Sequence, residues 1–191
     1  MEETERWAFV EMRGTRMPRG TELTEYALLD GGVLAEALLP DAPNHTEAKA
    51  LVDAVRSGAM AGCTTSGALG GLYARLARGG GASPDDVARQ VRALVEPPSA
   101  LLVLISGLEA SLQMLELAGR HNLGPEHLHT ARDAATALAA GVSTVYTYDV
   151  EAWEPFLADG LHIGGPSSVM ARWFRMPGAA GQSPVSGTDR T

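Results

Sequence analysis

Two short apolar runs in this chain, far apart in the sequence, each end in an aspartate. The first is Tyr26-Ala-Leu-Leu-Asp30, and the second is the β-rich run Ser143-Thr-Val-Tyr-Thr-Tyr-Asp149. Buried parallel strands have this composition, and their carboxyl ends gather at one edge of the sheet, where ligands bind. We therefore predict that Asp30 and Asp149 meet at that edge and hold a metal ion.

Composition limits the class of protein. With 191 residues and 20.0 kDa the chain is long enough for one domain with a sizeable core. Its net charge of -8 argues against a broad basic coat for nucleic acid, but a local basic groove remains open. The single cysteine, Cys63, excludes an internal disulfide and is expected in the core. Because there is neither a membrane-length apolar stretch nor a basic signal peptide, we predict a cytoplasmic protein.

Strand and helix signals alternate over residues 25–166. This order predicts a three-layer α/β/α domain with a central, mostly parallel sheet of four or five strands. Residues 1–24 are expected to be a weakly structured N-terminal extension, and residues 167–191, rich in Gly, Pro, Ala and Ser, a flexible tail. The expected strands are Tyr26–Leu29, Met60–Thr64, Leu101–Ile105, Ser143–Thr147 and Leu161–Ile163.

Capping signals mark the expected helices. The helices open at Asn44 with Glu47, at Ser83-Pro84 with Asp86, at Ser106 with Glu109, and at Pro125. In the third of these, Leu108, Leu112, Met114 and Leu115 form a wide apolar stripe, which is typical of a helix face packed on a core. The fourth is expected to run to Ala140 and to end at a glycine.

Five short motifs, in matching order and spacing, resemble those of the PIN-domain family, especially the VapC-type toxin ribonucleases. The resemblance covers about residues 26–166. The motifs are Leu29-Asp-Gly-Gly-Val-Leu34, Leu39-Pro-Asp-Ala-Pro-Asn-His45, Leu115-Glu-Leu-Ala-Gly-Arg-His-Asn-Leu123, His129-Thr-Ala-Arg-Asp-Ala-Ala-Thr-Ala-Leu-Ala-Ala-Gly141 and Val145-Tyr-Thr-Tyr-Asp149. The resemblance implies a PIN-like three-layer fold, a metal-dependent endoribonuclease with an RNA substrate, a cognate antitoxin as partner, and a homodimer.

The same resemblance implies the site. Such proteins use three or four carboxylates to bind Mg²⁺ or Mn²⁺, which polarises the phosphodiester and lowers the pKa of the attacking water. Asp30 and Asp149 match the first and last acids, but Gly71 and Thr130 replace the second and third. Half of the negative charge is missing, so weak metal binding and reduced activity are expected. The predicted metal ligands are Asp30, Asp149 and Thr130.

Two further acids are candidates to replace the missing ones. Asp133 lies one turn beyond Thr130, on a helix face that also includes Glu126, and it completes the predicted catalytic set with Asp30 and Asp149. Glu36, beyond the first strand, is the other candidate. The alternative for Asp133 is a solvated or ion-paired residue, and for Glu36 a solvated helix face.

Two functions from different classes therefore remain open. One is a toxin-family endoribonuclease with reduced activity, and the other is a catalytically inactive PIN-fold module that keeps only partner or RNA binding. An RNA-binding wall is possible if the arginines of two helices form one surface, and the alternative is a solvated arginine face. These arginines are Arg75, Arg78, Arg89 and Arg92. The apolar helices around 34–39 and 69–76 are the surfaces expected to support a homodimer.

Overall fold

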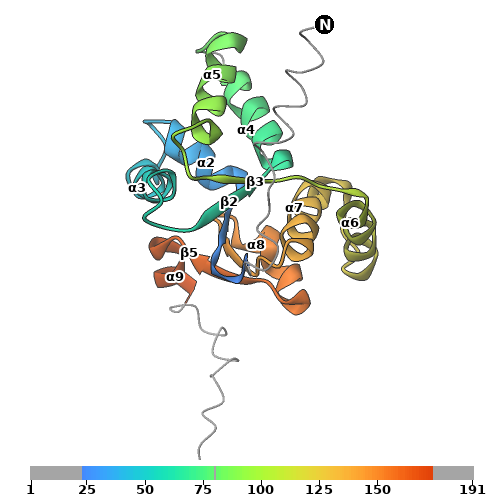
Figure 1. Cartoon of the computed structure of the whole chain (residues 1–191). Helices are drawn as coiled ribbons and strands as arrows, with labels where there is room; N and C mark the ends of the chain where they lie inside the picture. Colours follow the sequence, from blue (N-terminus) through green and yellow to red (C-terminus); the bar gives the residue numbers. More distant parts are fainter. Residues whose placement is uncertain (1–22, 80, 174–191) are drawn as a thin grey trace, which may run out of the picture.

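A computed structural model of the chain describes residues 23–79 and 81–173, and Figure 1 shows a central sheet between two layers of helices. All paired strands are parallel, in the order β3-β2-β1-β4-β5. The strands are β1 (Ala27–Leu29), β2 (Gly62–Thr65), β3 (Leu102–Leu104), β4 (Thr144–Tyr146) and β5 (His162–Gly165). The predicted three-layer architecture and all five expected strands are confirmed.

The helices divide between the two faces of the sheet, each with its own hydrophobic cluster. Side chains of α2 to α5 fill one cluster, and side chains of α6 to α8 fill the other. On β1, Leu28 points into the second cluster and Leu29 into the first, as the two-residue period of a strand requires. The helices of the first face are α2 (Gly31–Leu38), α3 (His45–Arg56), α4 (Ser66–Arg78) and α5 (Pro84–Val95), and those of the second are α6 (Leu108–Arg120), α7 (Leu128–Ala139) and α8 (Val150–Trp153).

Two of the predicted capping interactions do not form, although one of the two helices starts where predicted. Asn44 precedes α3 but makes no side-chain capping bond, and α6 begins after Gly107 rather than after Ser106. The Ser106 hydroxyl instead hydrogen-bonds the hydroxyl of Thr136 on α7, at 2.8 Å. The Ser83 cap of α5 is confirmed, because its hydroxyl accepts the N–H of Asp86. The start of α6 is therefore set by a tertiary contact rather than by the predicted cap, whereas α3 begins after Asn44 as predicted.

The helix expected from Pro125 has an irregular start. Residues Pro125–His127 form a 3₁₀ turn, η2, and α7 begins only at Leu128. Glu126 is consequently not on the α7 face that carries Thr130 and Asp133, and its side chain is exposed. The helix ends as predicted, with Gly141 in the left-handed region at a φ of 76°.

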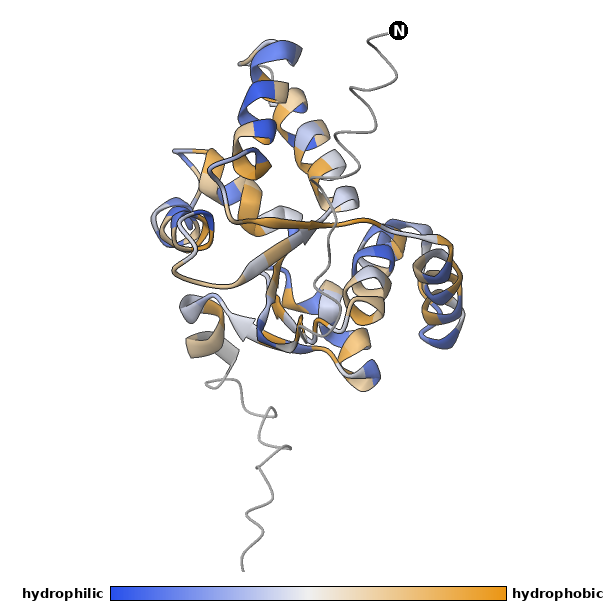
Figure 2. Ribbon diagram, viewed as in Figure 1, coloured by the Kyte–Doolittle hydropathy of each residue, from blue (hydrophilic) through white to orange (hydrophobic). Residues whose placement is uncertain are grey.

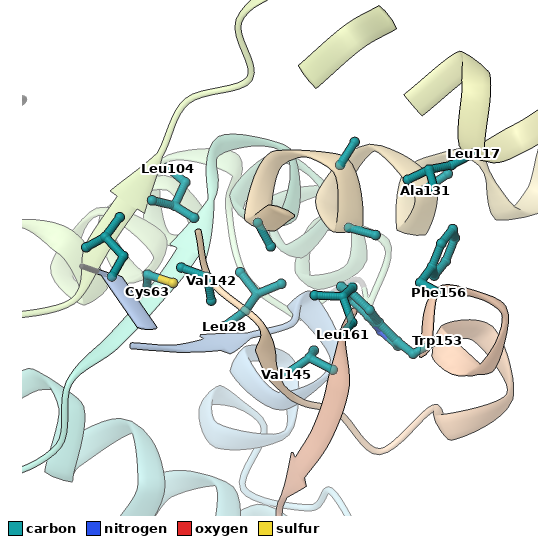
Figure 3. Close-up of a cluster of buried hydrophobic side chains, with 14 residues drawn as sticks. Leu28, Cys63, Leu104, Leu117, Ala131, Val142, Val145, Trp153, Phe156 and Leu161 are labelled. Carbon is teal, nitrogen blue, oxygen red and sulfur yellow. The ribbon is translucent and has the colours of Figure 1, made fainter. Parts of the chain in front are cut away.

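Figure 3 shows the cluster under α7, which includes Cys63 and two aromatic residues that follow β4. Trp153 ends α8, and Phe156 lies in the 3₁₀ segment η3 (Glu154–Asp159). Their rings meet edge to face, with centroids 6.2 Å apart, and both side chains are buried. Burial also raises the pKa of the Cys63 thiol to about 12, so this cysteine is the core residue that was predicted.

Most of the apolar stripe on α6 does not face the core. Leu108, Leu112 and Leu115 are exposed, whereas Met114 is partly buried against the cluster under α7. The fully buried positions of α6 are Ala110 and Leu117. The prediction failed because α6 packs mainly on α7, which contacts the opposite side of the helix. Conversely, three of the six leucines expected to leave an apolar surface on α2 and α4 are buried in their own domain, namely Leu34, Leu72 and Leu76.

Short helical segments lie at both ends of the described fold. A short 3₁₀ turn, η1 (Leu23–Glu25), leads into β1, and Leu23 is part of the cluster under α7. At the other end, α9 (Ser167–Trp173) occupies the first residues of the predicted tail, with Val169 buried. The rest of the predicted extension and tail, residues 1–22 and 174–191, lies outside the described residues. Within the described part, no helix is long and apolar enough to span a membrane.

Candidate functional site

Asp30 and Asp149 follow neighbouring strands at the same edge of the sheet. Asp30 comes directly after β1, and Asp149 comes three residues after the end of β4, which pairs with β1 in parallel. Carboxyl ends of adjacent parallel strands form the usual ligand-binding edge of such a sheet. The topological part of the prediction from the two apolar runs is therefore confirmed.

Asp30 is fixed by contacts to three elements. It is the N-cap of α2, and its Oδ1 accepts the Val33 N–H at 2.7 Å. Its Oδ2 accepts the hydroxyl of Thr147 at 2.5 Å, and the Trp153 side chain adds a further hydrogen bond. Only 8% of the residue is exposed. A carboxylate held in this way is preorganised, because it needs no reorientation to bind a cation.

Asp149 is linked to Asp30 through Thr147. Its backbone N–H donates to Thr147 Oγ1 at 2.9 Å, and the same hydroxyl donates to Asp30. The Asp149 side chain caps α8, with Oδ1 accepting the Ala152 N–H at 3.2 Å. Asp149 is more exposed than Asp30, so the pair consists of one buried and one accessible carboxylate.

The electrostatics of Asp30 favour a cation. Burial raises the pKa of Asp30 above its ordinary value, and the negative charge of Asp149 adds to the rise. The hydrogen bonds from Thr147, Val33 and Trp153 lower the pKa of Asp30 but do not cancel the effect of burial. A bound divalent cation would offset both the burial and the repulsion.

Asp133 and Thr130 lie on the buried face of α7, as their spacing predicts, but Asp133 is bound to other groups. The Thr65 hydroxyl donates to Asp133 Oδ1 at 2.6 Å, and Arg132 Nε lies 3.8 Å from that oxygen. Thr65 also accepts the Ala68 N–H as the N-cap of α4. Burial raises the pKa of Asp133, while Thr65, Arg132 and His129 lower it in that order of effect. Asp133 thus joins β2, α4 and α7.

The buried acid at position 133 predicts a pH-dependent stability. Because the pKa of Asp133 is higher in the folded chain, the folded state binds more protons than the unfolded state between the ordinary and the raised pKa. This group's contribution to the free energy of unfolding therefore falls as pH rises through that window. We expect Asp133→Asn, compared with wild type in urea titrations with a chelator present, to gain relative stability as pH rises from acid to neutral.

The matched control for this prediction is Asp85→Asn, because Asp85 is an exposed carboxylate at the start of α5. Its stability difference from wild type should not follow the same pH profile. If Asp133→Asn tracked the wild-type profile at every pH, the burial of a charged Asp133 in the native state would be contradicted.

The carboxylate of Glu36, the other candidate replacement, is also engaged in contacts with other groups. Its Oε2 accepts the Asn44 N–H at 2.9 Å, and Oε1 lies 3.8 Å from the guanidinium of Arg75. Nearby, Tyr148 donates to Glu47 at 3.2 Å, and burial together with Glu47 raises the pKa of the Tyr148 phenol. Glu47 also accepts both the backbone N–H and the hydroxyl of Ser168, so it ties α3 to α9.

There is free space around Gly71, the position at which the resemblance implies the second acid. Gly71 lies on the exposed side of α4, and a Cβ built there would meet no atom within 4 Å. Toward the C-terminal end of the same helix lie Arg75, paired with Glu36, and Arg78. Arg89 and Arg92 of α5 are instead ion-paired with acids of their own helix region, Asp85, Asp86 and Glu96. Three of the four arginines are thus ion-paired, and the choice between an RNA-binding wall and a solvated arginine face stays open.

The retained donors fit a weakly held divalent cation. Among residues 23–79 and 81–173, no group of three or more His, Cys, Asp or Glu side chains is placed to hold a metal ion. Asp30 and Asp149 remain, with carboxylate lone pairs beyond those used in hydrogen bonds. Mg²⁺ is often bound through one or two carboxylates together with water and substrate phosphates, which matches this donor set.

Three residues that position the site's carboxylates were not predicted to do so from the sequence. Thr147 and Trp153 hold Asp30, and Thr65 holds Asp133. The two threonines carry a signal that could have been used, because a hydroxyl at the carboxyl end of a buried strand must find a partner. Trp153 carries no such signal, since its spacing is equally typical of a core aromatic.

Comparisons with known proteins bear on the fold. No protein-family model and no curated protein sequence matches the chain. Among solved structures, the chain is similar to VapC20 of Mycobacterium tuberculosis, described as a sarcin-ricin loop cleaving toxin, with 18% identity and a TM-score of 0.56 over 71% of this chain and 96% of that one. It is also similar to FitAcB from Neisseria gonorrhoeae, with 18% identity and a TM-score of 0.52 over 73% and 97% of the two chains.

The fold is therefore that of a PIN-like domain. The five-stranded parallel sheet, its flanking helices and these two similarities agree on this class. More particularly, the fold is VapC-like, as the sequence motifs predicted.

Proposed function

We propose that this protein is a VapC-like member of a toxin–antitoxin pair, with a metal-dependent endoribonuclease site of reduced activity. The observation that carries the proposal is the pairing of Asp30 and Asp149 at adjacent strand ends, joined through the Thr147 hydroxyl. An RNA substrate, an antitoxin partner and a homodimer are part of the proposal, by resemblance to VapC-type toxins.

Each retained acid has a distinct part in this proposal. When bound, Mg²⁺ or Mn²⁺ would polarise the phosphodiester and lower the pKa of the attacking water. Asp30 supplies a rigid, buried ligand, and Asp149 supplies an accessible one at the mouth of the site. Thr130 is a weak neutral donor, and Asp133 is held by Thr65, so neither restores the missing charge. Metal affinity is accordingly low, and substrate phosphate contributes to the coordination.

A second function, the inactive binding module, is favoured by one specific observation. Both candidate replacements, Asp133 and Glu36, are engaged in other contacts rather than joined to Asp30 and Asp149. In this alternative the PIN fold keeps its partner surface, and RNA is not cut. Metal titration separates the two functions.

A rise in melting temperature with millimolar Mn²⁺ is the expected result for the endoribonuclease. Mass action gives about 1.4 kcal/mol of stabilisation at ten times Kd, and each kcal/mol raises the melting temperature of a chain this size by about 2–4 °C. Asp30→Asn should abolish the rise because it removes the buried ligand charge. The measurement is a thermal melt with and without Mn²⁺, paired with a gel assay of RNA cleavage.

The matched control is Asp41→Asn, which changes an exposed acid between α2 and α3 and should leave the Mn²⁺ response intact. A melting temperature that Mn²⁺ does not move, together with uncut RNA, would reject the endoribonuclease in favour of the binding module.

A further inference from the structure

Arg132 brings a positive charge to the sheet edge that carries Asp30. It belongs to α7, which lies beside the start of α4 in Figure 1 and shows both hydrophilic and hydrophobic residues in Figure 2. The parallel register of β1 and β2, continued by two residues, places Thr65 opposite Asp30. The Thr65 hydroxyl binds Asp133, the residue that follows Arg132. The charge of Arg132 therefore lies close to the candidate metal site.

A glycine leaves room for this guanidinium at the first turn of α4. Gly67 is the second residue of α4, and the Arg132 Nε lies 2.6 Å from the position that a Cβ would take there. Any other residue type would have to displace the guanidinium. The next residue, Ala68, contacts Gly31, with its carbonyl oxygen 3.4 Å from the Gly31 Cβ position. A continuous path of contacts thus joins Arg132 to Asp30 through the starts of α4 and α2.

The charge of Arg132 is only weakly neutralised within the described chain. Its ion-pair partner there, Asp133 Oδ1, lies 3.8 Å from Nε, which is too far for a hydrogen bond. Among residues 23–79 and 81–173, this Nε is buried without a hydrogen-bond partner, while 40% of the side chain remains exposed. An arginine can bind an oxyanion through two parallel N–H groups. The guanidinium is therefore available for an anionic ligand.

The charges at this edge indicate which anion needs such a residue. A phosphate of RNA that approaches Asp30 and Asp149 meets two carboxylates, and a weakly held metal ion offsets their repulsion only in part. Arg132 supplies a positive charge that the fold holds in place and that does not dissociate. Arg75 is less suited, because it lies toward the far end of α4 and is paired with Glu36.

From these contacts we infer that Arg132, packed on Gly67, is the phosphate-binding residue of this edge and holds a phosphate oxygen of RNA beside the Asp30–Asp149 pair. The inference deepens the proposed function and rests on it for the identity of the substrate as RNA. It adds the property that RNA binds at this edge without a divalent cation, because the guanidinium holds the phosphate. In the binding-module alternative, the same residue accounts for RNA binding without cleavage.

Fluorescence anisotropy of a short labelled single-stranded RNA, titrated with the full chain in the presence of a chelator, tests this role. Arg132→Gln should raise the dissociation constant roughly 10-fold, the usual effect of losing a hydrogen bond to a charged group. It should also reduce the slope of log affinity against log salt by about 0.7, the value for one phosphate contact on a single strand. Arg132→Lys keeps the charge but not the planar fork, so it should give an intermediate affinity with the wild-type slope.

Arg56→Gln is the matched control. Arg56 is also partly buried, with an Nε that has no hydrogen-bond partner among the described residues, but it ends α3 ahead of β2, at the amino edge of the sheet. This variant should bind RNA as the wild type does. Gly67→Ala tests the packing: its Cβ displaces the guanidinium but removes no charge, and alanine favours the helix. It should weaken RNA binding without lowering stability in urea.

The outcomes separate this inference from the proposed endoribonuclease. RNA that does not bind in the presence of chelator, an unchanged affinity and salt slope in Arg132→Gln, or an equal loss in Arg56→Gln would each overturn the inference. Failure of the endoribonuclease alone gives uncut RNA and a melting temperature that Mn²⁺ does not move, while the effect of Arg132→Gln on binding persists. Circular dichroism verifies folding, and Arg132→Lys and Gly67→Ala decide the question if Arg132→Gln does not fold.

Discussion

Restoring two carboxylates, with Gly71→Glu and Thr130→Asp in one chain, is expected to raise Mn²⁺-dependent RNA cleavage on the order of 1,000-fold. Removing one group that stabilises developing charge typically costs about 100- to 1,000-fold in rate, so regaining two should have at least the larger effect. Each carboxylate adds both a ligand and negative charge around the ion, and the two changes should therefore act together more strongly than their separate effects suggest.

The structure is compatible with both substitutions, but for different reasons. Gly71 lies within α4 with open space around its Cβ position, so a glutamate fits there and also favours the helix. Thr130 is buried on α7, so an aspartate there adds an unpaired charge whose burial is costly without a cation. The double variant should consequently depend on Mn²⁺ for stability as well as for activity, and thermal melts should report the difference.

A neighbouring glycine supplies a close control. Gly70 is also in α4 and equally open, but it points about 100° away around the helix. Gly70→Glu with Thr130→Asp should therefore leave cleavage far below that of the Gly71 pair. Adding Asp30→Asn to the restored chain should abolish cleavage. A wild type that cuts RNA rapidly, and still does so as Asp133→Ala and Glu36→Ala, would show that the catalytic residues lie elsewhere.

The fold was predictable because its strands leave strong local signals. Each is a short apolar or β-branched run bounded by turns, and the parallel order follows from the helices between them. The same reasoning placed Asp30 and Asp149 at one edge. The capping bonds of helices were less predictable than their positions, because the side chains of Ser106 and Glu47 bind distant partners, Thr136 and Ser168.

The main error of the sequence-based prediction was the expected burial of one face of α6. A stripe of Leu108, Leu112 and Leu115 predicts an apolar face but not what covers it, and in this chain α7 covers the other side of α6. For the site, it was the resemblance to PIN-domain motifs that implied missing acids at Gly71 and Thr130. It could not predict that Asp133 is held by Thr65, because that contact joins β2 to α7 across the sheet edge.

Trp153→Ala is expected to lower the free energy of unfolding by about 3–5 kcal/mol, the usual cost of truncating a buried aromatic residue. Trp153 is 3% exposed and packs edge to face on Phe156 under α7, as Figure 3 shows. The change removes both this packing and a hydrogen bond to Asp30. Urea denaturation at neutral pH measures the loss.

Two partner variants separate the packing of Trp153 from its effect on the site. Phe156→Ala should cost a similar amount, because Phe156 is fully buried in the same cluster, but it should leave the titration of Asp30 unchanged. Trp153→Phe keeps an aromatic ring and should cost less than Trp153→Ala. Because it removes the hydrogen bond that lowers the pKa of Asp30, that pKa should rise further.

The consequence of Trp153→Phe for metal binding has a definite sign. A higher pKa keeps Asp30 protonated to higher pH, so stabilisation by Mn²⁺ should weaken most at acid pH and recover as pH rises. Carboxyl ¹³C titration of Asp30 and Mn²⁺-dependent melting at two pH values measure the two effects. If Phe156→Ala shifted the Asp30 titration as much as Trp153→Phe does, general loosening of the core would explain the result better than the loss of one donor.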